Sequence, residues 1–299
     1  IIMDHKINRR EFLATALTAS LLWGTGRSAR AQEIGNSKKI VIVGAGISGL
    51  ATAWELTQRG FVVVVLEAND RPGGRVFTQR NGWKEGQYVE IGATRIADIH
   101  TLVLDYVKLF ELELDEFPAT ANALYYLQGK KFLESEEMSR IPTQWGLSAQ
   151  EIKEGLNWIK YHFMEMGFDD LGNILAKDWP SQELRKRYDS LVYSEYFKKM
   201  GASEGVISIL HTINGSEMDE YSALMWLAAE LIDQKWQKSY KIRGGNDRLC
   251  YAFAQRLKDA IRYQSKVVQI TKTPEGMAVI YQQGEENLKL TCDYVVCCV

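Results

Sequence analysis

The apolar and polar positions of residues 39–67 follow a strand, helix, strand pattern. Residues 39–43 (KIVIV) and 61–67 (FVVVVLE) are almost continuously apolar, which is typical of strands that are buried on both faces. Between them, residues 48–59 have helical composition and are followed by Gly60, a natural end for a helix. The pattern therefore predicts an α/β fold with a buried parallel sheet.

The pattern changes twice further along the chain. Residues 83–132 mix short extended segments with one helix at 101–110, whereas residues 148–236 are helical, amphipathic and rich in aromatic residues that we assign to packing. Strands then return: "YKIRGGNDRLCYAFAQRL" predicts a short strand, a glycine turn and a helix. Three further strands are predicted, in "IRYQSKVVQITKT", "GMAVIYQQG" and "LKLTCDYVVCCV".

Three glycines follow the first predicted strand at the spacing of a dinucleotide fingerprint. In G-x-G-x-x-G, Gly44 would form the tight turn, Gly46 would let the backbone approach a pyrophosphate, and Gly49 would let helix pack on strand. The phosphates would then face the unpaired amides of the helix N-terminus. Glu67 ends the second strand, 18 residues after Gly49, where a carboxylate can accept both hydroxyls of the adenosine ribose. The pattern predicts a Rossmann-like nucleotide site but does not decide between flavin and nicotinamide.

Composition and charge narrow the class of protein. The 299 residues are 46% hydrophobic, enough for a sizeable core, and the formal net charge of -2 comes from interspersed charges. We therefore expect a globular protein that does not bind nucleic acid. The four cysteines show no metal-ligand spacing, so we expect no metal site and favour buried thiols over disulfides.

Residues 1–31 differ in kind from the rest. Arg9 and Arg10 precede the apolar run "FLATALTASLLW", and Ala29-Arg30-Ala31 fits a signal-peptidase site. The segment resembles a twin-arginine export signal with cleavage after Ala31, and an ordinary secretory signal is the alternative. Either reading predicts an exported, periplasmic or secreted protein, since the run is too short for a stable membrane span.

Both ends of the chain suggest a piece of a longer protein. Ile1 and Ile2 precede the plausible start Met3, and the chain ends on "DYVVCCV", a run typical of a buried strand. We therefore expect this sequence to be an N-terminal portion.

The segment after Glu67 carries a family resemblance. "RPGGRVFT" at residues 71–78 resembles the R-x-G-G-R element of the flavin-containing amine oxidase superfamily, whose backbone amides and arginine approach the pyrophosphate and flavin. The G-G-x-x-x-L turn at residues 244–249 and the strand "SKVVQI" resemble the family's return to its flavin domain. The resemblance implies FAD as cofactor. The FAD contacts that the fingerprint and the resemblance imply are Gly44, Ala45, Gly46, Ile47, Ser48, Gly49, Glu67, Ala68, Gly73, Gly74, Arg75, Gly92, Ala93, Thr94, Arg95, Val267 and Val268.

The sequence patterns, together with the resemblances to an export signal and to the superfamily, divide the chain into five segments. These are a signal peptide (1–31), a first part of the FAD-binding domain (32–82), a substrate-binding region (83–147), a helical domain (148–238) and an incomplete return to the FAD-binding domain (239–299). The family's active-site lysine and its last flavin-binding strand and helix would lie beyond Val299.

One arginine indicates which substrate class of the superfamily to expect. In "EIGATRIADIH", Arg95 stands among small and apolar neighbours, where a guanidinium needs a partner; a structural ion pair with Glu90 or Asp98 would be one solution. L-amino-acid oxidases of the superfamily instead have a similar G-x-M-R motif, whose arginine binds the substrate α-carboxylate. Here Thr94 replaces the methionine.

The resemblance thus implies an FAD-dependent L-amino-acid oxidase. Such an enzyme converts an amino acid to a keto acid and ammonia and uses molecular oxygen, which becomes hydrogen peroxide. The alternatives are an amine or polyamine oxidase in which Arg95 makes a structural pair, a flavin-binding paralogue without turnover and, less favoured, a flavin desaturase. A homodimer is compatible with the sequence, which does not decide the oligomeric state.

Overall fold

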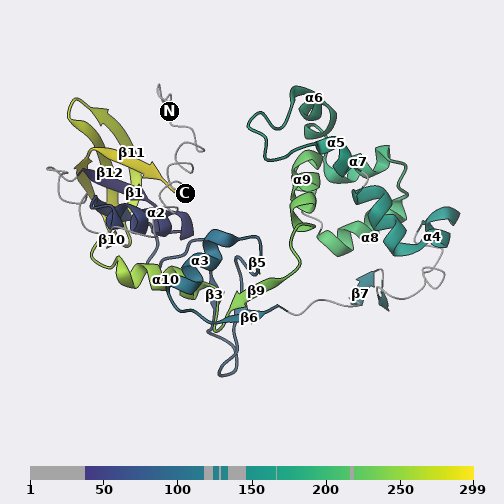
Figure 1. Ribbon diagram of the computed structural model, residues 1–299, viewed down its shortest axis with the longest axis horizontal. Helices are drawn as coiled ribbons and strands as arrows, with labels where there is room; N and C mark the ends of the chain where they lie inside the picture. The colour runs from purple at the N-terminus through teal and green to yellow at the C-terminus, as the bar shows by residue number, and fades with distance from the viewer. Residues whose placement is uncertain (1–37, 118–123, 128, 134–145, 166, 216–218) are drawn as a thin grey trace, which may run out of the picture. The chain divides into compact units, whose positions relative to one another are not determined.

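A computed structural model describes residues 38–117, 124–127, 129–133, 146–165, 167–215 and 219–299 (Figure 1). The export signal predicted at residues 1–31 lies outside the described residues. The chain divides into two compact units: residues up to Thr94 together with Gly244–Val299 form the first, and Arg95–Arg243 form the second. The five segments predicted from the sequence are a finer division, and their boundaries stay a prediction.

The first unit is built on a parallel four-stranded sheet with the strand order β10-β2-β1-β14. In the central strand, Val41 and Ile42 point to opposite faces and both are fully buried, as the apolar run predicted. The α/β prediction is therefore confirmed. The strands are β1 (Lys39–Val43), β2 (Val62–Leu66), β10 (Ile261–Arg262) and β14 (Tyr294–Cys297).

Two helices accompany this sheet. Helix α2 (Ile47–Gln58) packs on β1 and β2. Helix α10 (Asp247–Arg256) contacts α2, and the two helices lie close together in Figure 1. Gly60 has a φ of 83°, the left-handed conformation that ends a helix without steric cost. The predicted helix and its C-terminal glycine are thus both present.

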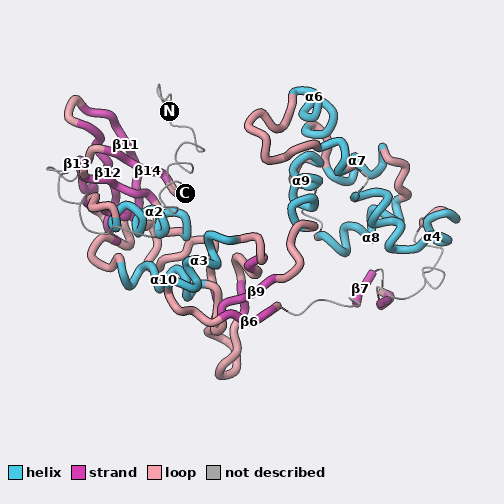
Figure 2. Tube along the Cα trace, in the orientation of Figure 1, coloured by secondary structure: helices cyan, strands magenta, loops and turns pink. Residues whose placement is uncertain are grey.

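A second sheet is an antiparallel meander in the order β11-β12-β13 (Figure 2), and β3 and β4 form a separate two-stranded antiparallel sheet. The sequence predicted three strands from residue 261 onward, and this was wrong, because two of those runs each break into strands of different sheets. Gln264, with a φ of 51°, separates β10 from β11. Asp293 separates β13 from β14, where its carboxylate accepts the Lys39 amide at 2.8 Å. The strands are β3 (Thr78–Gln79), β4 (Val89–Glu90), β11 (Lys266–Thr273), β12 (Gly276–Gln283) and β13 (Glu286–Cys292).

The second unit begins and ends on a small antiparallel sheet with the order β5-β9-β6. The predicted helix at 101–110 is present as α3, one residue shorter. The elements are β5 (Ile96–Ala97), α3 (Thr101–Leu109), β6 (Leu114–Glu116), β7 (Leu124–Leu127), β8 (Lys130–Leu133) and β9 (Ser239–Ile242).

The rest of the second unit is helical, as predicted. Its aromatic residues form a core around Tyr193 and Phe197, although Tyr161 is 59% exposed and does not belong to it. Ser203 and Ser222 cap α8 and α9 by accepting the amides of Val206 and Met225 at 3.2 Å. The helices are α4 (Ala149–Lys160), α5 (Phe168–Leu171), α6 (Gln182–Leu184), α7 (Tyr193–Lys199), α8 (Glu204–Asn214) and α9 (Ala223–Asp233), with π-helical turns at Tyr161–Glu165 and Arg185–Asp189. Among the described residues, no helix is both long enough and apolar enough to cross a membrane.

Candidate functional site

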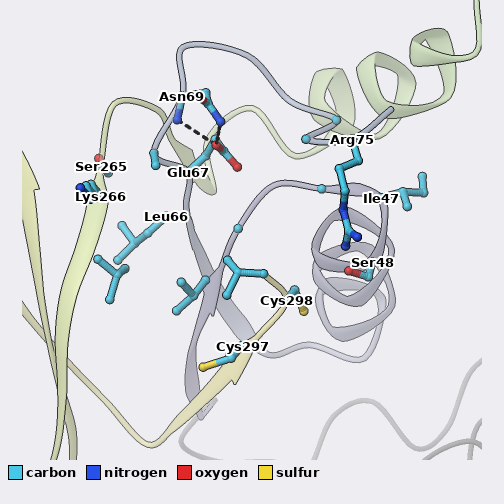
Figure 3. A pocket seen from close by; sticks show the side chains of 18 of the residues that line it. Ile47, Ser48, Leu66, Glu67, Asn69, Arg75, Ser265, Lys266, Cys297 and Cys298 are labelled. Atoms are coloured by element: carbon cyan, nitrogen blue, oxygen red, sulfur yellow. Dashed lines mark hydrogen bonds between the residues drawn. The ribbon is translucent and has the colours of Figure 1, made fainter. Parts of the chain in front are cut away.

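A cavity of about 690 Å³ lies in the first unit at the carboxyl ends of β1, β2 and β14 (Figure 3). Ligands of open parallel sheets bind at this edge, and the volume is within the range of small-molecule sites. Its lining comes from the glycine turn after β1, the end of β2, the R-x-G-G-R loop and the start of β11. The lining residues are Val43, Gly44, Gly46, Ile47, Ser48, Leu66, Glu67, Ala68, Asn69, Gly73, Gly74, Arg75, Val76, Ser265, Lys266, Val267, Val268, Gln269, Ile270, Cys297, Cys298 and Val299.

The fingerprint glycines have separate geometric roles. Gly44 has a φ of 99° and donates its amide to the Leu66 carbonyl at 2.8 Å, which closes the turn. A Cβ on Gly49 would lie 2.0 Å from the Gly44 carbonyl oxygen, whereas a Cβ on Gly46 would meet nothing within 4 Å and would stand at the cavity. Helix α2 begins at Ile47 without a side-chain cap or a first-turn acid. Its N-terminal amides therefore remain available to an anion.

The R-x-G-G-R loop lies directly against this turn. Gly73 donates its amide to the Ala45 carbonyl at 2.8 Å and pairs with Gly46 as a parallel bridge. Gly73 and Gly74 both have positive φ, 105° and 55°. Arg75 is exposed at the cavity, and Figure 3 shows its side chain extending toward Ser48. The cavity thus combines a helix N-terminus with a guanidinium, a combination suited to a pyrophosphate.

Glu67 is buried at the opposite part of the lining, with 5% of its surface exposed. One carboxylate oxygen accepts the Ala45 amide at 2.7 Å, and the other accepts the backbone and side-chain amides of Asn69, each at 2.8 Å (Figure 3). A carboxylate offers about four acceptor positions, so one is left for a ribose hydroxyl. The buried negative charge would disfavour a 2′-phosphate at the same place.

The start of β11 completes the lining on a third side. The register of β11 against β12 shifts between Val267 and Gln269, which leaves Val268 outside the ladder. Val268 is 52% exposed, so its backbone groups can bind the base of a nucleotide. Hydrophobic packing against the neighbouring sheet accounts for the side chain of Val267.

The cysteines only partly follow the prediction of buried thiols. Cys250 and Cys292 are buried, and burial raises the pKa of Cys250 to about 12. Cys297 is exposed and Cys298 is half-buried, because the carboxyl end of β14 opens on the cavity and both residues line it. Burial also raises the pKa of the Cys298 thiol.

Six predicted FAD contacts do not line this cavity: Ala45, Gly49, Gly92, Ala93, Thr94 and Arg95. Residues 91–93 instead run beside residues 75–77, where the Ala93 amide donates to the Arg75 carbonyl at 3.1 Å. A Cβ on Gly92 would lie 1.8 Å from that same carbonyl oxygen. The segment that leads to Arg95 is therefore bound to the backbone of the R-x-G-G-R loop.

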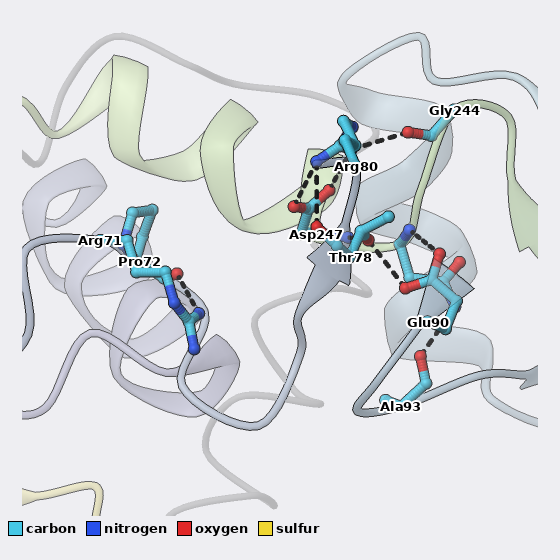
Figure 4. Close-up of polar contacts among 9 residues, drawn as sticks. Arg71, Pro72, Thr78, Arg80, Glu90, Ala93, Gly244 and Asp247 are labelled. Carbon is cyan, nitrogen blue, oxygen red and sulfur yellow. Dashed lines mark hydrogen bonds and ion pairs between the residues drawn. The ribbon is translucent and has the colours of Figure 1, made fainter. Parts of the chain in front are cut away.

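A partly buried polar network lies next to this segment (Figure 4). Arg80 forms a two-pronged ion pair with Asp247 at 2.6 and 2.8 Å, which raises the pKa of Arg80. Thr78 donates its hydroxyl to Glu90 at 2.7 Å and accepts the Asp247 amide at 3.3 Å. The other oxygen of Glu90 accepts the Asn246 amide at 2.9 Å. The network thus joins β3, β4 and the start of α10.

Arg95 belongs to the second unit and is exposed. Its guanidinium lies over the ring of Phe117, 4.6 Å from the ring centroid. Of the two acids weighed as partners, Asp98 accepts the Gln237 and Lys238 amides, and Glu90 is engaged in the network. Within the described residues of the second unit, no carboxylate forms an ion pair with Arg95. The geometry gives no support to the structural ion pair.

Sequence reasoning missed several residues of the site. Asn69 and Ser265 line the cavity but carry no motif, and Phe117 is separated from Arg95 by a helix. The ends of parallel strands are a general signal for ligand contacts, and applying it to β14 would have found Cys297 and Cys298.

Comparisons with known proteins identify the family. Residues 47–299 match the family described as flavin containing amine oxidoreductase. The chain is 30% identical over 269 residues to an L-amino acid oxidase of Bothrops pictus, with 88% of this chain and 53% of that protein covered. It is 31% identical over 280 residues to an L-amino acid oxidase of Cerastes cerastes, with 89% and 52% covered. The chain therefore spans about half the length of these relatives.

Solved structures agree in fold. A putrescine oxidase structure matches with a TM-score of 0.67 at 20% identity, with 88% of this chain and 58% of that chain covered. A cyclohexylamine oxidase from Brevibacterium oxydans IH-35A matches with a TM-score of 0.64 at 22% identity, with 87% and 57% covered. These likenesses confirm the predicted fold, and the family match confirms the predicted flavin cofactor, FAD. The chain belongs to the flavin-containing amine oxidoreductase family.

Proposed function

We propose that the protein containing this chain oxidises L-amino acids to keto acids, and that Arg95 binds the α-carboxylate of the substrate. The observation that carries this proposal is the state of Arg95, an exposed guanidinium with no carboxylate partner among the described residues of its unit. The names of the similar relatives, L-amino acid oxidases, support the same substrate class.

The surroundings of Arg95 suit it to hold a carboxylate. Because the ring of Phe117 covers one face of the guanidinium, the N–H groups at its edge remain free to donate. A carboxylate can accept two of these N–H groups in parallel, which fixes its orientation as well as its position. The planar fork of arginine makes this contact, whereas a lysine ammonium acts as a point charge.

The first unit supplies the cofactor site in this proposal. The α2 N-terminus and Arg75 would hold the pyrophosphate, Glu67 the ribose, and the start of β11 the adenine. Bound FAD would supply the acceptor for the hydride of the substrate α-carbon and the route by which the two electrons reach oxygen. The balanced reaction consumes an amino acid, oxygen and water, and it releases a keto acid, ammonia and hydrogen peroxide. By holding the carboxylate, Arg95 would fix the orientation of the substrate α-carbon, which lowers the entropic cost of the reaction. The proposed reaction requires no protein nucleophile.

A peroxide-coupled assay on the full-length protein tests the substrate class. Each L-amino acid is compared with the amine that remains after decarboxylation, and we expect turnover of the amino acids only. Turnover of the amines alone would remove the carboxylate role of Arg95 and favour an amine oxidase. If no substrate of either kind bleaches the bound flavin under anaerobic conditions, the protein is a flavin-binding paralogue without turnover.

Substitution of Arg95 tests the residue itself. Arg95→Lys keeps the charge but loses the fork, so we expect KM for L-amino acids to rise at least about tenfold, with a smaller change in kcat. Arg185→Lys, at another exposed arginine of the second unit, is the matched control. Equal KM values in both variants would contradict the proposal.

Export through the N-terminal segment belongs to the same proposal. Arg9 and Arg10 support a twin-arginine signal with cleavage after Ala31. A double substitution of Arg9 and Arg10 by lysine should leave the protein in the cytoplasm, with the uncleaved segment attached. Continued export of the double variant would indicate an ordinary secretory signal instead.

A further inference from the structure

The two points where the chain passes between the units lie close together in the first unit. The chain leaves this unit after Thr94 and returns to it at Gly244. The side-chain amide of Asn246 donates to the carbonyl of Ala93 at 2.9 Å, across a sequence separation of 153 residues. The Asn246 side chain therefore connects the segment that leaves the first unit to the segment that re-enters it. The contact is at Ala93, two residues before Arg95.

Asn246 uses its amide in an unusual way for its position. It is the residue before α10, where an asparagine side chain commonly accepts an amide of the first helical turn, but it makes no such bond. Its side chain is directed to Ala93 instead, and only 4% of the residue is exposed. The Asn246 side chain thus does not cap α10 and instead contacts the segment that leads to Arg95.

The backbone of Asn246 is itself held in place. Its amide donates to Glu90 at 2.9 Å, and Glu90 also accepts the hydroxyl of Thr78, which is buried (Figure 4). The residue that Asn246 holds continues the chain of contacts, because the Ala93 amide donates to the carbonyl of Arg75 at 3.1 Å. Asn246 therefore connects this polar network to the backbone of the R-x-G-G-R loop.

We propose that Asn246 is a positioning residue for substrate recognition. By holding the Ala93 carbonyl, it fixes the path of the backbone that bears Arg95 and thereby sets the preference for substrates with a carboxylate. This inference rests on the proposed function, in which Arg95 binds that carboxylate. Asn246 acts through Arg95 and does not itself contact the substrate.

The full-length protein with Asn246→Ala tests the inference. Loss of this partly buried hydrogen bond corresponds to a rise of about three- to tenfold in KM for L-amino acids. We expect kcat to change less, and the Kd of benzoate, a carboxylate probe read from the flavin absorbance, to rise by the same factor as KM. In a protein that already carries Arg95→Lys, Asn246→Ala should have almost no further effect, because the two residues act as one unit.

Two further variants separate positioning from stability. Lys38→Ala removes the ion pair with Asp293 and lies outside the network that includes Asn246, so it should lower the melting temperature slightly without changing the Kd of benzoate. Asn246→Ser keeps a shorter donor and should give an intermediate Kd. If Asn246→Ala does not fold, the serine variant carries the test alone.

The outcomes distinguish this inference from the proposed function. If Arg95→Lys leaves the Kd of benzoate unchanged, the proposed function fails and the inference fails with it. If Arg95→Lys weakens benzoate but the Asn246 variants do not, only the inference fails. Equal weakening by Asn246→Ala in the presence and absence of Arg95→Lys would show a structural effect that does not pass through Arg95.

Discussion

Two glycines of the same fingerprint should give opposite phenotypes when each is replaced by alanine. In Gly49→Ala the new Cβ would lie 2.0 Å from the Gly44 carbonyl oxygen, a backbone atom that cannot move alone. In Gly46→Ala the Cβ would meet no atom within 4 Å, and the φ of -67° at this residue suits any amino acid. The first change disturbs the fold, and the second places a methyl group where the pyrophosphate would lie.

The structure sets the expected magnitudes. To relieve the contact in Gly49→Ala, the turn must move by about 1 Å or more, and such overpacking costs about 1–3 kcal/mol. The hydrogen bond from the Gly44 amide to the Leu66 carbonyl is then weakened, at about 0.5–1.5 kcal/mol. The better helix propensity of alanine offsets about 1 kcal/mol of this cost, which leaves a net loss of roughly 0.5–3.5 kcal/mol. For Gly46→Ala we expect a change in stability within about 0.5 kcal/mol and a loss of FAD affinity of at least about tenfold.

The assay measures stability and cofactor binding separately. Melting temperatures of the full-length apoprotein report stability, and quenching of FAD fluorescence on titration with apoprotein reports affinity. Gly60→Ala, at a position with open space around the Cβ but a φ of 83°, shows the cost of backbone strain alone. The reasoning is refuted if Gly46→Ala binds FAD normally, or if it destabilises the apoprotein as much as Gly49→Ala does.

Three further predictions concern titratable groups. Although burial opposes it, hydrogen bonds from Ser148 and Ser203 lower the pKa of Glu151, so its carboxylate stabilises the fold above about pH 4.3, and this stabilisation is lost as the pH falls. Glu151→Gln should therefore lower the melting temperature at pH 7 and differ less from wild type below pH 4. Burial raises the pKa of Glu230, so ionisation of this carboxyl group at pH 7 destabilises the folded state. Glu230→Gln should therefore raise the melting temperature at pH 7, and a lowered melting temperature would contradict this. Iodoacetamide at pH 8, followed by mass spectrometry, should modify Cys297 in the apoprotein and not in the FAD-bound protein; equal modification would place FAD elsewhere.

Local patterns were sufficient for the first strand, helix and strand of the first unit, β1, α2 and β2. The continuous apolar run of β1, the helix after it and the glycine at its end are properties of neighbouring residues, and the structure has all of them. The strand prediction failed where one apolar run contributes strands to two different sheets. Neither Gln264 nor Asp293 breaks a hydrophobic pattern strongly, and Asp293 ends β13 through a contact with Lys39, which is distant in the chain.

The sequence by itself determined that this chain has an α/β nucleotide-binding fold, and it selected Arg95 as the residue to test. The fold could be predicted because a glycine fingerprint and its ribose-binding acid act within a single strand, helix and strand, where spacing alone places them. Arg95 was selected by its resemblance to the G-x-M-R motif of L-amino-acid oxidases. Only the tertiary structure decided that Arg95 lies over Phe117 and that Asn246 holds Ala93. Those contacts join residues far apart in sequence, and their formation depends on which strands pair and which side chains the fold buries together.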